Sequence, residues 1–478
     1  MKRSPSSFLR DHLFAPVDAT LLVFFRIAFG SIMMWEVWRY LDMNRISRYF
    51  IDPAIHFTYY GFDWVRPWAG NGMYWHFYAL GLLALMITVG FCYRVATTLF
   101  FLGFTYVFLL DQTQYLNHFY LVSLVAFLLI FVPTHTAFSV DAALHPKLRS
   151  PVVPAWTLWL LRFQIAVPYF FGGIAKLGPD WLSGEPMRTW LAKRSDFPVL
   201  GPYFHEEWMV YSFVLGGLLL DLLVVPMLLW RPTRVLAFLL ATSFHLLNAQ
   251  LFTIGIFPWF MLCATLLFVR PETPRRLWHA LRGKLKPAPI ETEATTATLP
   301  AAVPSRWTSA QRGIAGALAA YMAVQVLVPF RHLLYPGNVD WTEEGHRFSW
   351  HMKLRDKQGQ ALFLVKDPVS GHVSEVYPEE YLTLRQCEKM STRPDMILQF
   401  CHYLAEQLRQ PGQPPMEVRA ETLVSLNGRE PQPIVNPTIN LAAEPRTLQK
   451  APWIMPLEIP LSRRALPGLG NQRFAGTD

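Results

Sequence analysis

The chain has 478 residues, of which 52% are hydrophobic and only 16% are charged. Because soluble domains carry about 25% charged residues, this composition predicts a membrane protein with a smaller soluble part. The formal net charge is +9, but the basic residues are spread over loops without a continuous run. That distribution is typical of cytoplasmic membrane loops and argues against a nucleic-acid partner.

Apolar segments recur from the N-terminus to residue 330, and each approaches the roughly 20 residues that a helix needs to cross a bilayer. The nine predicted spans cover residues 19–38, 74–93, 95–111, 117–134, 156–176, 209–230, 233–251, 253–270 and 309–330. The first segment is preceded by basic residues, and no small-residue cleavage site follows it. We therefore expect a retained first helix rather than a signal peptide.

Basic residues in the loops indicate the orientation of the chain. The N-terminus and the stretch 270–287 are rich in Lys and Arg, whereas the short loops near 112–117 and 248–253 contain neither. The positive-inside rule places the basic segments in the cytoplasm. An odd number of spans then places residues 331–478 on the other side of the membrane.

The composition changes after the spans. Residues 285–308 are rich in Pro, Ala and Thr, which predicts a flexible cytoplasmic linker. Further on, alternating stretches predict strands, and apolar residues at helical spacing predict one amphipathic helix at 391–410. The predicted strands lie within 360–367, 372–378, 416–426 and 433–441. The expected fold is thus a polytopic α-helical membrane protein of about nine transmembrane helices (1–330), followed by a β-rich extracytoplasmic domain (331–478).

Several ionisable residues lie inside or at the ends of the predicted spans, and such residues are functional candidates because a charge in lipid is costly. They are Arg26, Glu36, Asp111, His118, Arg162, Lys176, Asp221 and His245. Each also has a structural interpretation. Arg26 and Glu36 can sit near helix ends, and Arg162 and Asp221 can form buried pairs between helices.

The predicted topology gathers one group of polar residues at the outer membrane face. The group consists of Asn117, His118, Lys176, His245, Asn248 and Gln250. Structural polar residues alone would be expected at both faces, so this one-sided placement favours a site under the exported domain.

Lys176 follows an apolar span and precedes a Gly-Pro turn. A dry pocket disfavours the charged form of an amine, and a neutral amine is a general base or a nucleophile. A base at the bilayer edge suits a hydrophobic substrate with an acidic head, such as a hydroquinone. The structural alternative is that Lys176 extends to the membrane interface, as lysines at span ends do. His118 and His245 can ligate a metal or be hydrogen-bonded core residues, and no spacing motif favours a metal.

A set of short stretches, in order along the chain, carries a family resemblance. The stretches are LGLLALMITVGFCYR, YVFLLDQTQYLNH, FSVDA, AKLGPDW, FHLLNAQLFTIGIFPW, FSWHMK, LVSLN and APWIMPL. They resemble the vitamin K-dependent gamma-glutamyl carboxylases, which belong with the bacterial horizontally transferred transmembrane (HTTM) proteins. The resemblance covers nearly the whole chain, including the tail.

The resemblance implies an integral membrane enzyme of the carbon–carbon lyase class. It places the catalytic base at Lys176, which would deprotonate vitamin K hydroquinone or a menaquinol-like quinol. Reaction with O₂ would then give the epoxide and a base strong enough to remove a glutamate γ-proton, after which CO₂ adds. No metal is implied. The implied partners are the lipid membrane and a glutamate-containing peptide or exported protein.

The resemblance also implies roles for single positions. His118 joins Lys176 as a catalytic residue; the implied hydroquinone contacts are Asn117, His245, Asn248 and Gln250; and the implied contacts of the glutamate peptide are Ile254, Trp350, Met352, Arg385 and Trp453.

Some positions depart from the family pattern. Ala175 replaces a second lysine, Lys353 replaces an apolar residue, and His346 replaces a tyrosine. Cys401 has no partner cysteine in the loop 39–73, so the family's disulfide is not expected. A pairing of Cys401 with Cys387 stays open. With the shorter C-terminal region, these departures indicate a bacterial inner-membrane protein, or an ER membrane protein with a lumenal domain if the source is eukaryotic.

Three hypotheses follow. The first is a glutamyl carboxylase driven by quinol epoxidation. The second is a quinol epoxidase or oxygenase without carboxylation, because the departures lie on the side of the peptide substrate. The third is a membrane transporter or scaffold, although transporters often contain repeated halves and no repeat is visible here.

Overall fold

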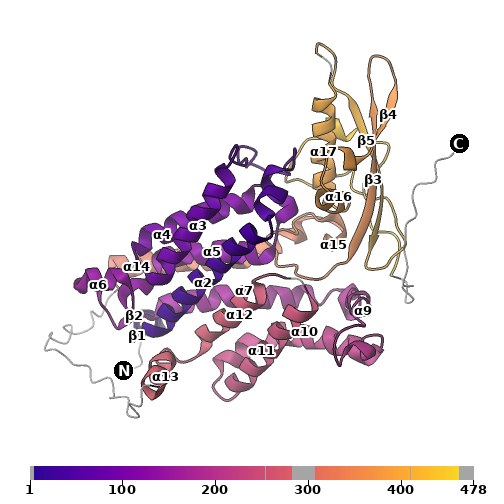
Figure 1. The fold of residues 1–478 in the computed structure, drawn as a ribbon. Helices are drawn as coiled ribbons and strands as arrows, with labels where there is room; N and C mark the ends of the chain where they lie inside the picture. Colours follow the sequence, from indigo (N-terminus) through magenta and orange to yellow (C-terminus); the bar gives the residue numbers. More distant parts are fainter. Residues whose placement is uncertain (1–4, 253, 282–306, 410, 462–478) are drawn as a thin grey trace.

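The computed structural model describes residues 5–252, 254–281, 307–409 and 411–461. A bundle of long helices makes up most of the molecule, and a smaller sheet-containing domain lies at one end of the bundle (Figure 1). The other end carries the small antiparallel sheet of β1 (Pro16–Asp18) and β2 (Val152–Pro154), together with the short helices α6 (Val140–Leu144) and α13 (Thr273–Leu281) (Figure 1). Residues 285–306 of the predicted linker 285–308 lie outside the described part of the chain.

Six helices in the described part of the chain are long and apolar enough to cross a membrane. They are α2 (Thr20–Asp42), α3 (Gly72–Val89), α7 (Ala155–Ala175), α10 (Glu207–Leu229), α11 (Arg234–Leu251), and α14 (Ser309–Leu327) with its continuation η7 (Val328–Leu334). Shorter apolar helices occupy the other predicted positions: α4 (Tyr93–Leu109), α5 (Asn117–Phe131), and α12 (Phe257–Thr265) with η6 (Leu266–Phe268). A total of nine spans stays a prediction, because these three are shorter than the roughly 20 residues of a full crossing.

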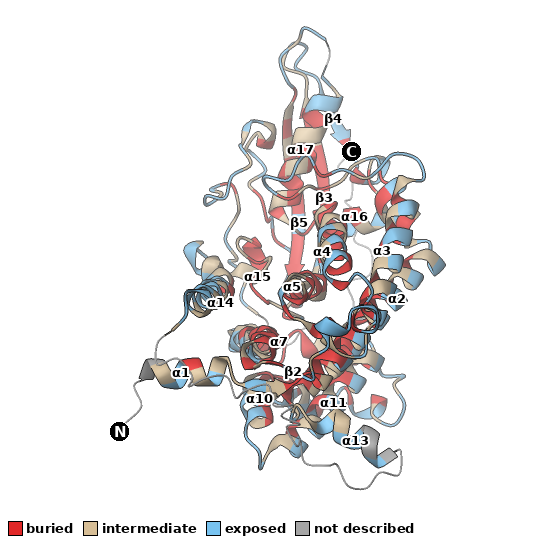
Figure 2. Cartoon of the chain, turned by 90° about the vertical axis from the view of Figure 1, so that its left-hand side faces the viewer, coloured by how far each residue is buried: buried red, intermediate tan, exposed pale blue. Residues whose placement is uncertain are grey.

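The helices differ in how deeply they are buried. In α2 and α7, 61% of the most apolar 18-residue window is buried, against 11% in α14. Figure 2 shows the same contrast, with buried residues along α7 and mainly exposed ones along α14. Because α14 exposes apolar side chains, we expect it to face lipid, whereas α2 and α7 form the interior.

Two glycines near the end of α7 allow it to pack closely against α10. A Cβ on Gly173 would lie 2.6 Å from Cδ2 of Leu222 and 3.2 Å from its backbone nitrogen. A Cβ on Gly172 would lie 3.4 Å from Oδ2 of Asp221. Since only glycine fits at Gly173 without displacement, the sequence GG sets the close approach that brings the end of α7 to Asp221.

The tail domain contains a three-stranded antiparallel sheet in the order β4-β3-β5. The strands are β3 (Lys357–Lys366), β4 (Val373–Val376) and β5 (Glu417–Leu426). Helix α17 (Pro394–Gln407) packs against β3 and β5, with Phe400 and Cys401 fully buried in a core separate from that of the bundle. Proline at its first turn begins this helix, since its missing N–H needs no partner there.

The structure corrects two predictions for this domain. The stretch 433–441 forms no strand but contributes one isolated bridge, between Val435 and Ile454. Pro437 lies within this stretch, and proline cannot donate to a sheet ladder. The predicted helix 391–410 is α17 alone, and a second helix, α16 (Leu384–Met390), precedes it behind a Thr383–Gln386 capping box.

The remaining short helices are α1 (Pro5–Leu13), α8 (Pro179–Leu182), α9 (Met187–Ala192) and α15 (Val339–Thr342). All four cysteines are free thiols, so Cys387 and Cys401 do not pair.

The bundle and the tail domain each contribute a side chain to the other's hydrophobic core. Trp350 is 1% exposed and belongs to the core of the bundle, whereas Phe57 from the first loop belongs to the core of the tail domain. A two-pronged ion pair also joins the parts, because Nη1 and Nη2 of Arg429 lie 2.6 and 2.7 Å from the carboxylate oxygens of Asp180. The division into 1–330 and 331–478 therefore stays a prediction, since each part completes the other's core.

Candidate active site

A cavity of about 800 Å³ lies where the bundle meets the tail domain. Helices α2, α5, α7, α10, α11 and α12 contribute its walls on the bundle side, and residues 346–355 and α16 contribute the other side. The cavity is large enough for a small organic molecule. Its walls change from apolar along the helices to strongly basic near α16.

Lys176 caps the C-terminus of α7 and is buried, with its Nζ 2.6 Å from Oδ2 of Asp221 on α10. The two side chains are only 8% and 7% exposed. The ammonium group also donates to the carbonyl oxygen of Gly172 at 3.4 Å and lies 5.2 Å from the ring centre of Trp181. Lys176 therefore points into the protein, and its partner is a carboxylate.

Two other ionisable residues of the spans, Arg26 and Arg162, have backbone carbonyl groups as partners. Arg26 donates to the carbonyl oxygens of Thr134 and Phe138, and Arg162 donates to those of Leu267 and Val269. Arg162 and Asp221 are the two residues predicted to form buried pairs between helices. Of these two, Asp221 forms an ion pair among the described residues, and its partner is Lys176.

The two histidines of the group both lie near the ring of Phe257. The ring centre of Phe257 is 5.7 Å from that of His118 and 6.1 Å from that of His245. His245 is 1% exposed and shares a 2.7 Å hydrogen bond with the hydroxyl of Tyr169 on α7. Both histidines line the cavity.

Asn117 connects the first turn of α5 to the tail. Its Oδ1 accepts from the Tyr115 hydroxyl at 2.9 Å, and its Nδ2 donates to the carbonyl oxygen of His351 at 3.3 Å. The Tyr115 hydroxyl in turn accepts from the backbone N–H of Phe348 at 2.7 Å. These bonds hold the segment 346–355 over the end of the bundle.

The structure brings most of the predicted site residues to the cavity. The lining includes Asn117, His118, Lys176, His245, Asn248, Ile254, Met352 and Arg385. Three predicted residues do not line it: Gln250, Trp350 and Trp453.

Each of these three exceptions has a physical reason. Gln250 follows Asn248 by two positions on α11, and residues two apart do not share a helix face, so its side chain is exposed. Trp350 packs against Tyr120, with ring centres 5.0 Å apart. Trp453 is buried in the core of the tail domain. The predicted chemical roles of all eleven residues stay predictions.

Asp221 is the main residue of the site that the sequence predicts only as a member of a buried pair between helices. It was visible as an ionisable residue in a span, but its partner lies 45 positions away. Tyr169 and Asp180 were likewise not singled out, because nothing in their local sequence marks a long-range partner.

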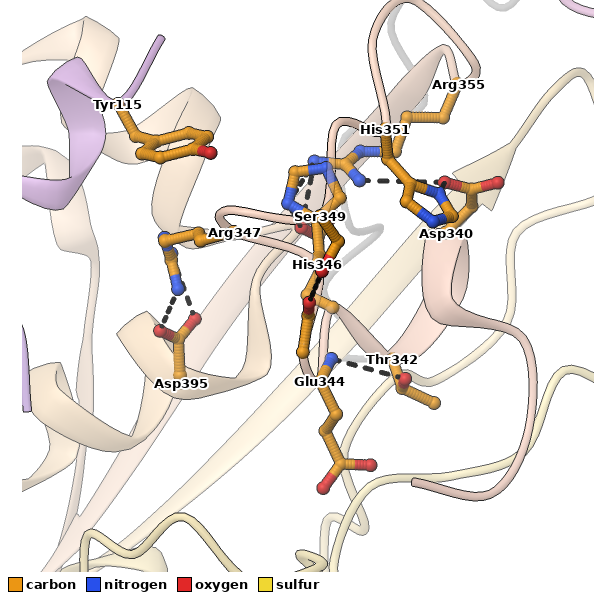
Figure 3. A network of polar contacts seen from close by, with 12 residues as sticks. Tyr115, Asp340, Thr342, Glu344, His346, Arg347, Ser349, His351, Arg355 and Asp395 are labelled. Atoms are coloured by element: carbon orange, nitrogen blue, oxygen red, sulfur yellow. Dashed lines mark hydrogen bonds and ion pairs between the residues drawn. The ribbon is translucent and has the colours of Figure 1, made fainter. Parts of the chain in front are cut away.

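A buried charged network borders the cavity on the tail side. Arg355 lies 2.9 Å from Glu343 and 3.7 Å from Asp340, and Lys357 lies 3.3 Å from Glu343. Burial alone would raise the pKa of Glu343, but Arg355, Lys357 and further cations outweigh it and lower the pKa to about 2. Figure 3 shows the Arg355 side chain beside His346 and His351. Burial, reinforced by Arg355, holds the pKa of His346 well below its usual value.

The comparisons with known proteins cover both parts of the chain. The family model of the HTTM domain matches residues 14–272, more than half of the chain. The model described as the lumenal domain of vitamin K-dependent gamma-carboxylase matches residues 310–459. The chain belongs to the vitamin K-dependent gamma-carboxylase family. No solved structure matches it significantly.

Membership of this carboxylase family confirms the resemblance seen in the sequence and suggests a vitamin K-dependent carboxylase-like enzyme. The family implies vitamin K hydroquinone, a membrane and glutamate-containing substrate proteins. The six apolar helices and the lumenal-type domain agree with a membrane protein.

Proposed function

We propose that this carboxylase-family protein is a gamma-glutamyl carboxylase-like membrane enzyme in which Lys176 is the base that deprotonates a vitamin K-like hydroquinone. The observation that carries the proposal is the buried Lys176–Asp221 pair, 2.6 Å apart, in the wall of the cavity. The oxidative carboxylation of a glutamate side chain, with O₂ and CO₂ as co-substrates and vitamin K epoxide as the second product, is the reaction class.

The pair can supply a neutral amine without exporting a proton to water. Lys176 and Asp221 together hold one ionisable proton, and low-dielectric surroundings reduce the advantage of the separated charges. When the proton resides on the carboxylate, the lone pair of Nζ is free to accept the proton of a phenolic hydroxyl. The pair then carries one positive charge, which stabilises the anion formed beside it.

The cavity has the chemistry that a quinol requires. Its helical walls are apolar and aromatic, with Phe213, Leu220, Phe244, Phe257 and Met261 among the lining residues. Near these walls, Asn117 and His118 offer polar groups that can orient a ring oxygen. When bound, vitamin K hydroquinone would supply the reaction with O₂ and the strong base that removes the glutamate γ-proton.

The two parts of the chain suit two different substrates. A lipid-soluble quinol can enter from the side of the bundle, and a peptide can enter from the side of the tail domain, where Met352 and Arg385 line the cavity. We further propose nine spans, a tail outside the cytoplasm, and a bacterial inner-membrane location. Both substrates would then meet at the membrane surface.

The test uses purified full-length protein in detergent with vitamin K hydroquinone, O₂, labelled bicarbonate and a glutamate peptide. Epoxide and fixed label are measured together for the wild type, for Lys176→Ala and for the matched control Lys147→Ala, an exposed lysine outside the cavity. We expect both products from the wild type and the control and neither from Lys176→Ala. Equal products from Lys176→Ala would refute the assignment of the base.

A second candidate is quinol oxygenation without carboxylation. The observation that favours it is Lys353, whose Nζ lies 5.1 Å from the Trp190 ring centre and 4.8 Å from that of Phe252 in the cavity wall. A cation at this apolar position alters the site on the peptide side. Epoxide without fixed label would favour this candidate, and absence of both products would favour a transporter or scaffold.

A further inference from the structure

Three histidines and an aspartate lie together on the tail side of the cavity, apart from the proposed base and its partner. His351 lines the cavity, and its ring centre lies 4.8 Å from that of His332 and 6.0 Å from that of His346. Asp340, on the short helix α15, lies beside His351 (Figure 3). The proposed function gives these side chains no role.

Two polar atoms of this group face each other without a hydrogen bond. Nδ1 of His351 and Oδ1 of Asp340 lie 3.6 Å apart, and neither atom has a hydrogen-bond partner among the described residues. Buried polar atoms without partners are costly. A movement of less than about 1 Å would bring the two atoms to the roughly 2.9 Å of a hydrogen bond. We call these two residues the His351–Asp340 dyad.

The dyad connects the cavity to the surface of the tail domain. Because Nδ1 of His351 is directed at Asp340, the other ring nitrogen, Nε2, is the one that remains for the cavity. The side chain of His351 is only 7% exposed, whereas that of Asp340 is 20% exposed and does not line the cavity. An imidazole can gain a proton on one nitrogen and lose one from the other, so the dyad can pass a proton from the cavity to water.

The charged neighbours hold the aspartate in position. Nη1 of Arg355 lies 3.7 Å from the same Oδ1 of Asp340, and its Nη2 lies 2.9 Å from Glu343, which also pairs with Lys357. The carboxylate of Asp340 is therefore placed between a fixed cation and the ring of His351. A carboxylate in this position stabilises the imidazolium form that exists while the proton passes.

The other two histidines of the group are occupied. Nδ1 of His332 donates to the carbonyl oxygen of Pro329 at 2.7 Å. Nδ1 of His346 accepts from Nη2 of Arg355 at 3.4 Å, and burial holds the pKa of His346 well below its usual value, so this ring stays neutral. His351 is thus the histidine of this group whose Nδ1 has no hydrogen-bond partner among the described residues and faces a carboxylate.

The proposed reaction releases one proton in each turnover. The hydroquinone is oxidised and O₂ is reduced: the two hydroquinone hydrogens and one oxygen atom form water, and the other oxygen atom enters the epoxide. CO₂ replaces a γ-hydrogen of glutamate, and this hydrogen leaves as a proton because the product carries two carboxylates. Lys176 and Asp221 are only 8% and 7% exposed, so the proton that the pair accepts needs a path to water before the next turnover.

We propose that the His351–Asp340 dyad is the proton exit of the cavity. His351 takes up a proton at Nε2 and passes one from Nδ1 to Asp340, which releases it to the water around the tail domain. The exit returns the Lys176–Asp221 pair to its starting state after each turnover. This inference rests on the proposed function for the source of the proton.

The test compares the first turnover with the later ones. Epoxide formation by purified full-length protein in detergent is followed by rapid quenching, with vitamin K hydroquinone, O₂, bicarbonate and a glutamate peptide at neutral pH and with little added buffer. The variants are His351→Gln and Asp340→Asn, and the matched control is His372→Gln, an exposed histidine of the tail domain outside the cavity. His351→Gln keeps the backbone carbonyl that accepts from Asn117.

We expect both dyad variants to form the first equivalent of epoxide at the wild-type rate, because the Lys176–Asp221 pair has not yet accepted a proton. Later turnovers should be at least about tenfold slower, since proton transfer by a positioned group contributes on this scale. Added imidazole should restore most of the lost rate, because it carries protons out of the cavity. The control should match the wild type in every turnover.

The outcomes separate this inference from the proposed function. Later turnovers at the wild-type rate in both variants, a first turnover that is slowed as much as the later ones, or no recovery with imidazole would overturn the proton exit, even though epoxide is formed. No epoxide from the wild type would refute the proposed function, and with it the source of the proton.

Discussion

The buried Lys176–Asp221 pair makes a strong prediction about stability. Replacing Asp221 by Leu leaves the ammonium of Lys176 without its carboxylate partner, and replacing Lys176 by Met leaves the carboxylate of Asp221 without its ammonium partner. Each single change should destabilise the protein severely. The double variant, Lys176→Met with Asp221→Leu, buries no charge and should recover most of the lost stability.

The distance sets the size of the effect. For opposite charges 2.6 Å apart, Coulomb's law with an effective dielectric constant of about 20 gives an attraction of about 6 kcal/mol. Loss of hydration offsets much of this, so removing one partner is expected to cost about 3–5 kcal/mol. At about 2 °C per kcal/mol for a chain of this size, Tm should fall by roughly 6–10 °C.

The assay is a double-mutant cycle on thermal unfolding in detergent, followed by tryptophan fluorescence. The chain offers a matched control in the pair Lys193–Asp356, with Nζ and Oδ2 3.0 Å apart but with side chains 56% and 21% exposed. An exposed pair contributes about 0–1 kcal/mol. We therefore expect a coupling free energy of several kcal/mol for the buried cycle and less than about 1 kcal/mol for the control cycle.

Two results would refute this reasoning. If both cycles give the same small coupling, water reaches Lys176 and the pair is not buried in solution. If the double variant is as unstable as the single ones, the loss comes from packing rather than from an unpaired charge. Under the proposed function, the double variant should regain stability but no quinol-dependent activity, because it contains no base.

Three further predictions concern packing, the junction between the parts and pH. Gly173→Ala should lower stability by about 1–3 kcal/mol, since the new methyl group has no space against α10. The control Gly313→Ala places its methyl group in open space and should leave Tm unchanged or slightly raised. Equal Tm values for the two variants would contradict the close packing of α7 on α10. Asp180→Asn should cost about 3 kcal/mol, because Arg429 is 7% exposed and loses its only carboxylate partner among the described residues. Hydrogen exchange should then speed up at the end of β5; unchanged exchange there would show that other contacts hold the junction. The pKa of Glu343 is lowered to about 2. The ionised carboxylate therefore contributes about 3 kcal/mol to the stability of the fold above about pH 4.5, and this contribution disappears as pH falls toward 2. Glu343→Gln should flatten this part of the acid-unfolding curve, and a curve of unchanged steepness would exclude the charged network as its cause.

Local patterns in the sequence were sufficient for most of the architecture. Apolar runs of span length mark the helices because hydrophobicity along a membrane helix is a property of consecutive residues. The predicted positions of α2, α7 and α10 agree with the structure within a few residues. Ordered motifs also identified the family, and the one-sided gathering of Asn117, Lys176 and their neighbours agrees with one cavity.

Other features depended on tertiary structure. The sequence contains Lys176 and Asp221 as two isolated ionisable residues, and only the close approach of α7 to α10 at Gly173 joins them. Arg45 and Arg385 line the same cavity although they lie far apart in the sequence. Pairings of this kind depend on the distance between helices and on which way each side chain points, and neither is encoded in the neighbouring residues. The helices and the family follow from the sequence, whereas the partners of the charged groups follow from the packing.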